Sequence, residues 1–174
     1  MASAFQKREK KYLPEFVYGG TDGSITTFAV VAGAIGASLS STIILILGFA
    51  NLLADGFSMA VSNYLSTKSQ KDLYPKNKIK IPIKTAIATF LSFVVIGFIP
   101  LLSFVIAAFI PSLIPIQFTL SFILTAISLI IIGSVKGIIT NKGPIKASLE
   151  TLLIGGIAAL LAFAAGYFIN SLLT

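Results

Sequence analysis

Polar side chains recur every four residues inside one long apolar stretch of the chain. The set is Asn51, Asp55, Met59 and Asn63. Residues four apart lie on the same face of a helix, and Ser58, Ser62 and Ser66 widen this face into a polar stripe. A carboxylate near the middle of a bilayer costs on the order of 3 kcal/mol. We therefore expect Asp55 to be protonated, paired or bound to a cation.

Two further carboxylates stand at the starts of apolar stretches. Asp22 opens the first stretch and Glu150 opens the last. A carboxylate in the first turn of a helix complements the helix dipole by about 0.3–1 kcal/mol, and for Glu150 this explanation is at least as good as a functional one. Around Asp22, the hydroxyl groups of Thr21 and Ser24 raise the polar density, which favours a functional role.

The donor types indicate a divalent metal. Carboxylate and amide oxygens with one thioether suit Fe(II) or Mn(II) better than Cu(I) or a structural zinc ion. The chain has no histidine and no cysteine, which excludes thiolate zinc sites, haem ligation through histidine and Ser-His or Cys-His nucleophiles. We expect no enzymatic activity and no bound cofactor. An alternative stays open, in which a protonated Asp55 is structural and hydrogen-bonded to Asn51 or a serine, while Met59 fills core space.

The elements that position these groups are expected to be membrane helices. Hydrophobic residues make up 56% of the chain and charged residues 11%, with a mean hydropathy of +0.96; so few charges cannot cover a water-facing surface. About 20 apolar residues cross a bilayer. We predict an all-α integral membrane protein with one domain over residues 1–174. Its parts are a cytoplasmic or interfacial segment at 1–21 and transmembrane helices at about 22–40, 41–67, 83–110, 115–135 and 148–172.

Two prolines modify this prediction. Pro100 lies inside the third predicted span, where it removes a backbone donor and is expected to kink the helix. Residues 5–17 are basic and partly apolar, which is typical of a short interfacial helix, although Pro14 weakens that interpretation.

Basic residues predict the topology. All thirteen precede the first span, lie between the second and third, or lie between the fourth and fifth. The positive-inside rule then places the N-terminus in the cytoplasm and the C-terminus outside. These flanks also account for the net charge of +7, so we expect no nucleic-acid partner. No targeting extension is recognisable, which favours a prokaryotic cell membrane over the alternative of a vacuolar membrane.

Small residues at four-residue spacing predict close helix contacts. The two sets are Ala29, Gly33 and Ala37 in the first span and Ala158, Ala162 and Gly166 in the last. Two interpretations fit them: packing within one bundle, or an interface between two copies of the chain.

Two stretches resemble a known family. The run TDGSITTFAVVAGAIGASLS, followed by ILILGFANLLADGFSMAVSNYLSTKSQKD, resembles the first helical hairpin of the vacuolar iron transporter (VIT) family, and ETLLIGGIAALLAF resembles its last helix. The resemblance implies a five-helix homodimer with a pathway between the protomers. It also implies export of ferrous iron or manganese from the cytosol by proton antiport, with Asp22 as the pathway carboxylate and Met59 as the pathway methionine.

The chain departs from the family pattern at two places. Plant relatives carry a glutamate at the position of Asn51 and no carboxylate at that of Asp55, so the acid has moved by one helical turn. Many members also insert an acidic helical domain between the second and third spans. Here the stretch KSQKDLYPKNKIKIP is basic, with Asp72 as its single acid. We therefore expect the accessory site that loads metal in those relatives to be missing.

The leading hypothesis is a divalent-metal transporter in a lipid bilayer, with metal ions, protons and a second copy of the chain as partners. Asp22 and Asp55 would bind Fe(II) or Mn(II) when deprotonated and release the ion when protonated, and Met59 would disfavour Mg(II) and Ca(II). The secondary ligands or gate-side acceptors would be Asn51, Asn63 and Glu150. The alternative is a non-transporting membrane scaffold or assembly subunit in which Asp55 holds helices together.

Overall fold

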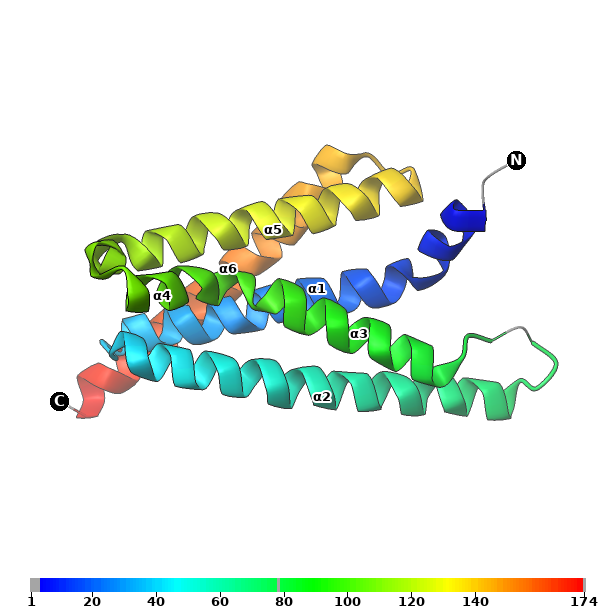
Figure 1. Ribbon diagram of the computed structural model, residues 1–174, viewed down its shortest axis with the longest axis horizontal. Coiled ribbons are helices and arrows are strands. Elements are labelled where there is room, and N and C mark those ends of the chain that lie inside the picture. The colour runs from blue at the N-terminus through cyan, green and yellow to red at the C-terminus, as the bar shows by residue number, and fades with distance from the viewer. Residues whose placement is uncertain (1–3, 78, 174) are drawn as a thin grey trace.

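The fold is a bundle of long helices (Figure 1). The computed structural model describes the backbone of residues 4–77 and 79–173, with side chains from residue 11 onward. In chain order the elements are α1 (Ala4–Gly36), α2 (Ser41–Leu73), α3 (Pro82–Gly97), α4 (Ile99–Phe109), the short 3-10 helix η1 (Pro111–Ile116), α5 (Gln117–Thr140) and α6 (Pro144–Leu173). Helices satisfy their own backbone hydrogen bonds, as apolar stretches in lipid must. The prediction of an all-α protein is confirmed for the described residues.

Among the described residues, four of the predicted spans have the length and hydropathy to cross a membrane when the bent pair α3 and α4 is counted as one span. Three are α2, the continuous segment Pro111–Thr140 and α6, and the fourth is the pair α3 and α4, which are bent by 45°. The chain is therefore a multi-pass membrane protein. The bend confirms the kink expected from Pro100, which is buried at the start of α4. The hydroxyl group of Ser121 on α5 donates a hydrogen bond to the Pro100 carbonyl oxygen at 2.6 Å.

The first predicted span differs from the structure. The helix does not begin at residue 22 and end at residue 40, with a separate helix at 5–17. Instead α1 is continuous from Ala4 to Gly36 and accommodates Pro14 inside it. This helix is not among those apolar enough to count as a membrane span in the described part of the chain. The total of five spans therefore stays a prediction.

The position of α1 explains why it tolerates polar residues. It runs through the middle of the bundle, between α2 on one side and α5 and α6 on the other (Figure 1), and packs most extensively against α3 and α6. Ser24 and Thr27 are completely buried, and Ser24 shares a 2.7 Å hydrogen bond with Ser128 of α5. Because neighbouring helices cover much of α1, its side chains do not all need to be apolar.

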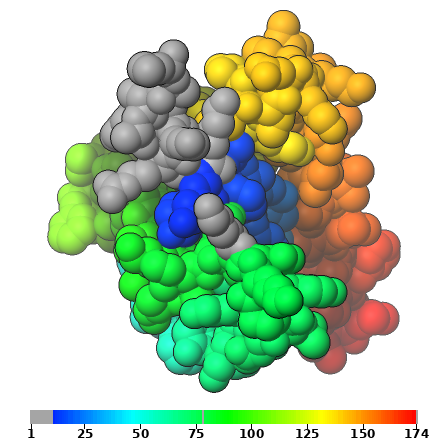
Figure 2. Space-filling model, turned by 90° about the vertical axis from the view of Figure 1, so that its right-hand side faces the viewer, coloured from blue at the N-terminus to red at the C-terminus, as the bar shows by residue number. Residues whose placement is uncertain are grey.

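The chain connections lie at two ends of the bundle. The α2–α3 and α5–α6 connections share one end with the start of α1, while the α1–α2 turn, η1 and the C-terminus lie at the other (Figure 1). Figure 2 views the first end, where residues near the α2–α3 and α5–α6 connections flank α1. The predicted segments that carry the basic residues therefore converge at one end, called the basic end below. Which side of a membrane it faces stays a prediction.

The two small-residue patterns pack against each other within one chain. A side chain added at Gly33 would contact the backbone of Ala162, and one added at Gly36 would contact the backbone of Phe163. Gly166 lies in turn against the backbone of Gly33. Close approach of α1 and α6 requires these small residues. The interpretation as intramolecular packing holds, and these stripes are not free to form an interface between copies.

Candidate functional site

Asp22 and Asp55 come together from two helices. Asp22 is half-buried on α1, Asp55 is exposed on α2, and the two carboxylates are close enough to interact electrostatically. The glycine next to Asp22 sets this geometry, because a Cβ at Gly23 would lie 2.5 Å from the carbonyl oxygen of Phe93 on α3. The hydroxyl group of Thr26 donates to the Asp22 carbonyl oxygen at 2.8 Å. Asp22 is thus held on a rigid, closely packed part of α1.

Helix α2 buries one face and leaves its polar face uncovered. The buried face contains Ile44, Gly48, Leu52, Gly56 and Ala60, again at four-residue spacing. The polar stripe predicted from the sequence lies beside it, and Asp55, Ser58, Ser62 and Ser66 are exposed in the single chain. A carboxylate and three hydroxyl groups on the outside of a membrane span are costly against lipid. They are compatible with water or a second protein chain.

The two predicted asparagines connect α2 to its neighbours. Asn51 donates to the hydroxyl oxygen of Thr27 on α1 at 3.4 Å. Asn63 donates to the hydroxyl oxygen of Thr89 on α3 at 2.7 Å and accepts a hydrogen bond from Thr67 at 3.2 Å. Both amides therefore position α2, and Asn63 uses both its oxygen and its nitrogen in doing so.

Met59 and Glu150 lie in different surroundings. Met59 is half-buried and packs against the hydrophobic core. Glu150 forms an exposed ion pair with Lys136 at 3.1 Å. It faces a cavity of about 480 Å³ that Lys142 and Lys146 also line. The structure surrounds Glu150 with lysines, so its part as a secondary metal ligand stays a prediction.

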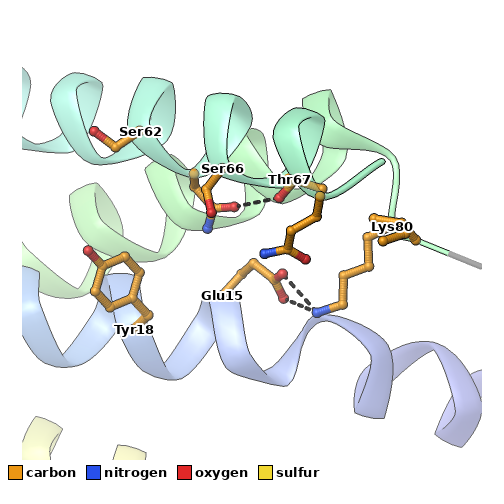
Figure 3. A pocket seen from close by; sticks show the side chains of 9 residues that line it. Glu15, Tyr18, Ser62, Ser66, Thr67 and Lys80 are labelled. Atoms are coloured by element: carbon orange, nitrogen blue, oxygen red, sulfur yellow. Dashed lines mark hydrogen bonds and ion pairs between the residues drawn. The ribbon is translucent and has the colours of Figure 1, made fainter. Parts of the chain in front are cut away.

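The structure brings together two charged residues that the sequence pattern does not single out as site residues. Glu15 of α1 is only 6% exposed, and the Lys80 ammonium lies 2.8 and 2.9 Å from its two carboxylate oxygens (Figure 3). Glu15 stands seven residues before Asp22, which is two helical turns on the same face. That spacing is a signal for Glu15 in the sequence, but Pro14 weakens the expectation of a helix there.

Glu15 and Lys80 border a polar cavity of about 670 Å³ between α1, α2 and the α2–α3 connection. Figure 3 shows Glu15 and Tyr18 pointing from α1 across the cavity towards α2. The lining residues are Glu15, Tyr18, Ser62, Asn63, Ser66, Thr67, Gln70, Ile79 and Lys80. Because Ser62, Asn63 and Ser66 also belong to the α2 polar stripe, the cavity meets that stripe at its basic end.

The acids do not form a complete metal site within one chain. The described residues contain no group of three or more carboxylate, histidine or cysteine side chains that could hold a metal ion. Asp22 and Asp55 supply two carboxylates, and Mn(II) or Fe(II) requires further oxygen, nitrogen or sulfur ligands. Those ligands must come from neutral groups, water or another molecule.

The sequence of this chain matches known proteins. The model of the VIT family matches residues 13–81 and 75–167. A vacuolar iron transporter of Plasmodium berghei (strain Anka) is 27% identical over 229 residues, which covers 94% of this chain and 84% of that protein. One of Toxoplasma gondii (strain ATCC 50861 / VEG) is 45% identical over 67 residues, only 38% of this chain and 22% of that protein.

The lengths of these matches agree with the expectation that this chain lacks an insertion between the second and third spans. The match to the Plasmodium protein extends over 229 positions, more than the 174 residues of this chain, so that relative has residues with no counterpart here. The two matched segments of the family model meet at residues 75–81, in the short α2–α3 connection. Vacuolar iron transporter homolog 4 of Arabidopsis thaliana, 29% identical over 162 residues, covers 86% of this chain and 79% of that protein. With the acid pair, the polar α2 stripe and these matches together, the chain belongs to the VIT family.

Proposed function

We propose that this protein exports Fe(II) or Mn(II) from the cytosol by proton antiport. The observation that carries the proposal is the pair of carboxylates, Asp22 and Asp55, on two adjacent helices of a multi-pass VIT-family protein. Two acids close together favour a divalent cation, since it neutralises both at once. The names of the relatives, vacuolar iron transporter, support iron as cargo.

The uncovered polar stripe supports a homodimer as the working unit. In one chain Asp55 and its neighbouring serines face outward from a membrane-spanning helix. A second copy related by a two-fold axis would bring the same stripe opposite, because C2 interfaces use the same patch on both subunits. Such a dimer doubles the carboxylates from two to four and encloses a polar path between the protomers. Met59, one turn from Asp55, would supply the thioether that discriminates against Mg(II).

Protons and metal would compete for the same oxygens. A carboxylate must be deprotonated to bind a metal ion, so protonation of Asp22 and Asp55 releases the cargo. A higher proton concentration on the receiving side therefore drives release there. This competition couples the two gradients without any covalent step.

The test is metal uptake into proteoliposomes made with the purified protein. Fe(II), Mn(II), Co(II) and Mg(II) are offered separately, with and without a pH gradient. We expect gradient-dependent uptake of Fe(II) or Mn(II) but not of Mg(II). Asp22→Asn and Asp55→Asn should each abolish it, because an amide binds a divalent ion weakly and cannot titrate.

Asp72→Asn is the matched control. It removes the same charge from the exposed, basic end of α2, away from the acid pair, and should transport like the wild type. Well-folded wild-type protein that takes up no metal would contradict the proposal. So would full transport activity of the Asp22→Asn and Asp55→Asn variants. The scaffold alternative instead predicts that Asp55→Asn is tolerated, because an amide still forms hydrogen bonds.

A further inference from the structure

The polar cavity at the basic end holds an acid with an internal cation already bound to it. Glu15 is nearly inaccessible, at 6% exposed, and both of its oxygens accept hydrogen bonds from the Lys80 ammonium at 2.8 and 2.9 Å. Figure 3 shows these two contacts at the edge of the cavity. A buried carboxylate without a partner is costly, so Glu15 needs a cation at this position.

Lys80 is held less firmly than Glu15. Its side chain is 29% exposed against 7% for that of Glu15, and it lies in the irregular connection just before α3. Its second contact is with the ring of Tyr12, 5.8 Å from the ammonium. The lysine can therefore swing towards solvent without unfolding a helix, whereas the glutamate is fixed on α1.

The cavity has the lining and the position of an entry to the acid pair. Its other polar groups are neutral oxygen and nitrogen donors, among them Tyr18, Ser62 and Ser66. A volume of about 670 Å³ exceeds by far the roughly 30 Å³ that one water occupies in the liquid, so a hydrated cation fits. Glu15 lies about 10 Å along α1 from Asp22, at 1.5 Å per residue. The cavity thus lies between the basic end and the acid pair, along the same faces of α1 and α2.

We propose that this cavity is a vestibule for a hydrated divalent cation, with Glu15 as its first carboxylate ligand and Lys80 as a tethered cation that competes for it. An arriving ion displaces the ammonium from Glu15, and Lys80 returns when the ion moves on towards Asp22 and Asp55. The cavity is then never left with an uncompensated carboxylate. This inference rests on the proposed transport function, but the binding step can be tested without transport.

The binding test uses the full chain in detergent and Mn(II) alone, with free Mn(II) measured by electron paramagnetic resonance. Asp22→Asn and Asp55→Asn are present throughout, which removes the proposed acid pair and isolates the vestibule. We expect Lys80→Gln to tighten Mn(II) binding by at least about tenfold, because the competing ammonium and its two charge-assisted hydrogen bonds to Glu15 are lost. Glu15→Gln should abolish this binding with or without Lys80→Gln.

Lys84→Gln is the matched control, because it removes one exposed positive charge from the start of α3 without touching Glu15. It should leave Mn(II) affinity within about twofold. Equal tightening by Lys84→Gln and Lys80→Gln would mean that general charge, and not competition at Glu15, sets the affinity, and would overturn the inference. Size-exclusion profiles and melting temperatures check that every variant is folded.

The transport assay separates this inference from the proposed function. With Asp22 and Asp55 intact, Lys80→Gln should lower the KM for Mn(II) by a similar factor, while Glu15→Gln should raise it. Wild-type transport with a KM that neither change alters would overturn the vestibule and leave the transporter standing. If Mn(II) binding responds to the Lys80 and Glu15 substitutions but the protein transports no metal, the vestibule stands and the proposed transport function is overturned.

Discussion

Gly23→Ala is the sharpest test of how the acid pair is positioned. Gly23 lies in close contact with the backbone of α3. An added Cβ would lie 2.5 Å from the carbonyl oxygen of Phe93, 3.0 Å from its Cα and 3.1 Å from its carbonyl carbon. All three are backbone atoms and cannot rotate away. The methyl group therefore forces α1 and α3 apart and shifts the adjacent Asp22.

The size of the effect follows from two opposing contributions. Overpacking a tight contact costs about 1–3 kcal/mol, and the upper end applies because the obstacle is backbone. Replacing glycine by alanine inside a helix stabilises the folded protein by about 1 kcal/mol, because alanine has the higher helix propensity. The net loss is then about 2 kcal/mol. For a chain of this size, 1 kcal/mol corresponds to roughly 2–4 °C in melting temperature, so a fall of about 4–8 °C is expected.

Gly156→Ala is the matched control. Gly156 lies in the interior of α6, and a Cβ there would meet nothing within 4 Å. Its substitution should keep the propensity gain and raise the melting temperature by about 2–4 °C. Both variants are heated in detergent, and the folded fraction is read by size-exclusion chromatography. A Gly23→Ala variant as stable as Gly156→Ala would refute the close approach of α1 and α3.

Three other substitutions are read in the same melting assay. Ser38→Gly should stabilise the protein by about 1 kcal/mol, because Ser38 lies in the turn after α1 with a φ of 57°. This left-handed conformation costs side-chain-bearing residues about 1–2 kcal/mol, so no change would argue against this turn geometry. Asn63→Ala should destabilise by about 1–3 kcal/mol, since it leaves Thr89 and Thr67 without their amide partner. Glu150→Gln should alter stability by less than about 0.5 kcal/mol at high salt, because its ion pair is exposed, and a larger loss would show that the pair is structural.

Much of the membrane architecture was predictable from the sequence because lipid imposes simple rules. Apolar runs of about 20 residues must be helices, and the predicted spans after the first correspond to helices in the structure. The convergence of the predicted basic segments at one end followed from charge placement alone. Pro100 predicted the break between α3 and α4, since proline removes a backbone donor wherever it stands in a helix.

The same rules failed for α1 because they assume a lipid-facing helix. Hydropathy and Pro14 together predict two short segments, but α1 is one helix that packs extensively against α3 and α6. Burial inside a protein replaces lipid with packing and hydrogen bonds, such as that of Ser24 with Ser128. Only the tertiary structure decides which helix takes the central place.

In the candidate site, too, some features follow from the sequence and others only from the tertiary structure. The four-residue spacing by itself determined that Asp55 shares a face with Asn51, Met59 and Asn63 of α2, because helix geometry fixes which residues share a face. Only the tertiary structure brought Asp22 beside Asp55, turned Asn63 towards Thr89 and joined Glu15 to Lys80 across 65 positions of sequence. Those contacts depend on how closely α1, α2 and α3 approach, and that distance is set by three-dimensional packing that no local pattern encodes.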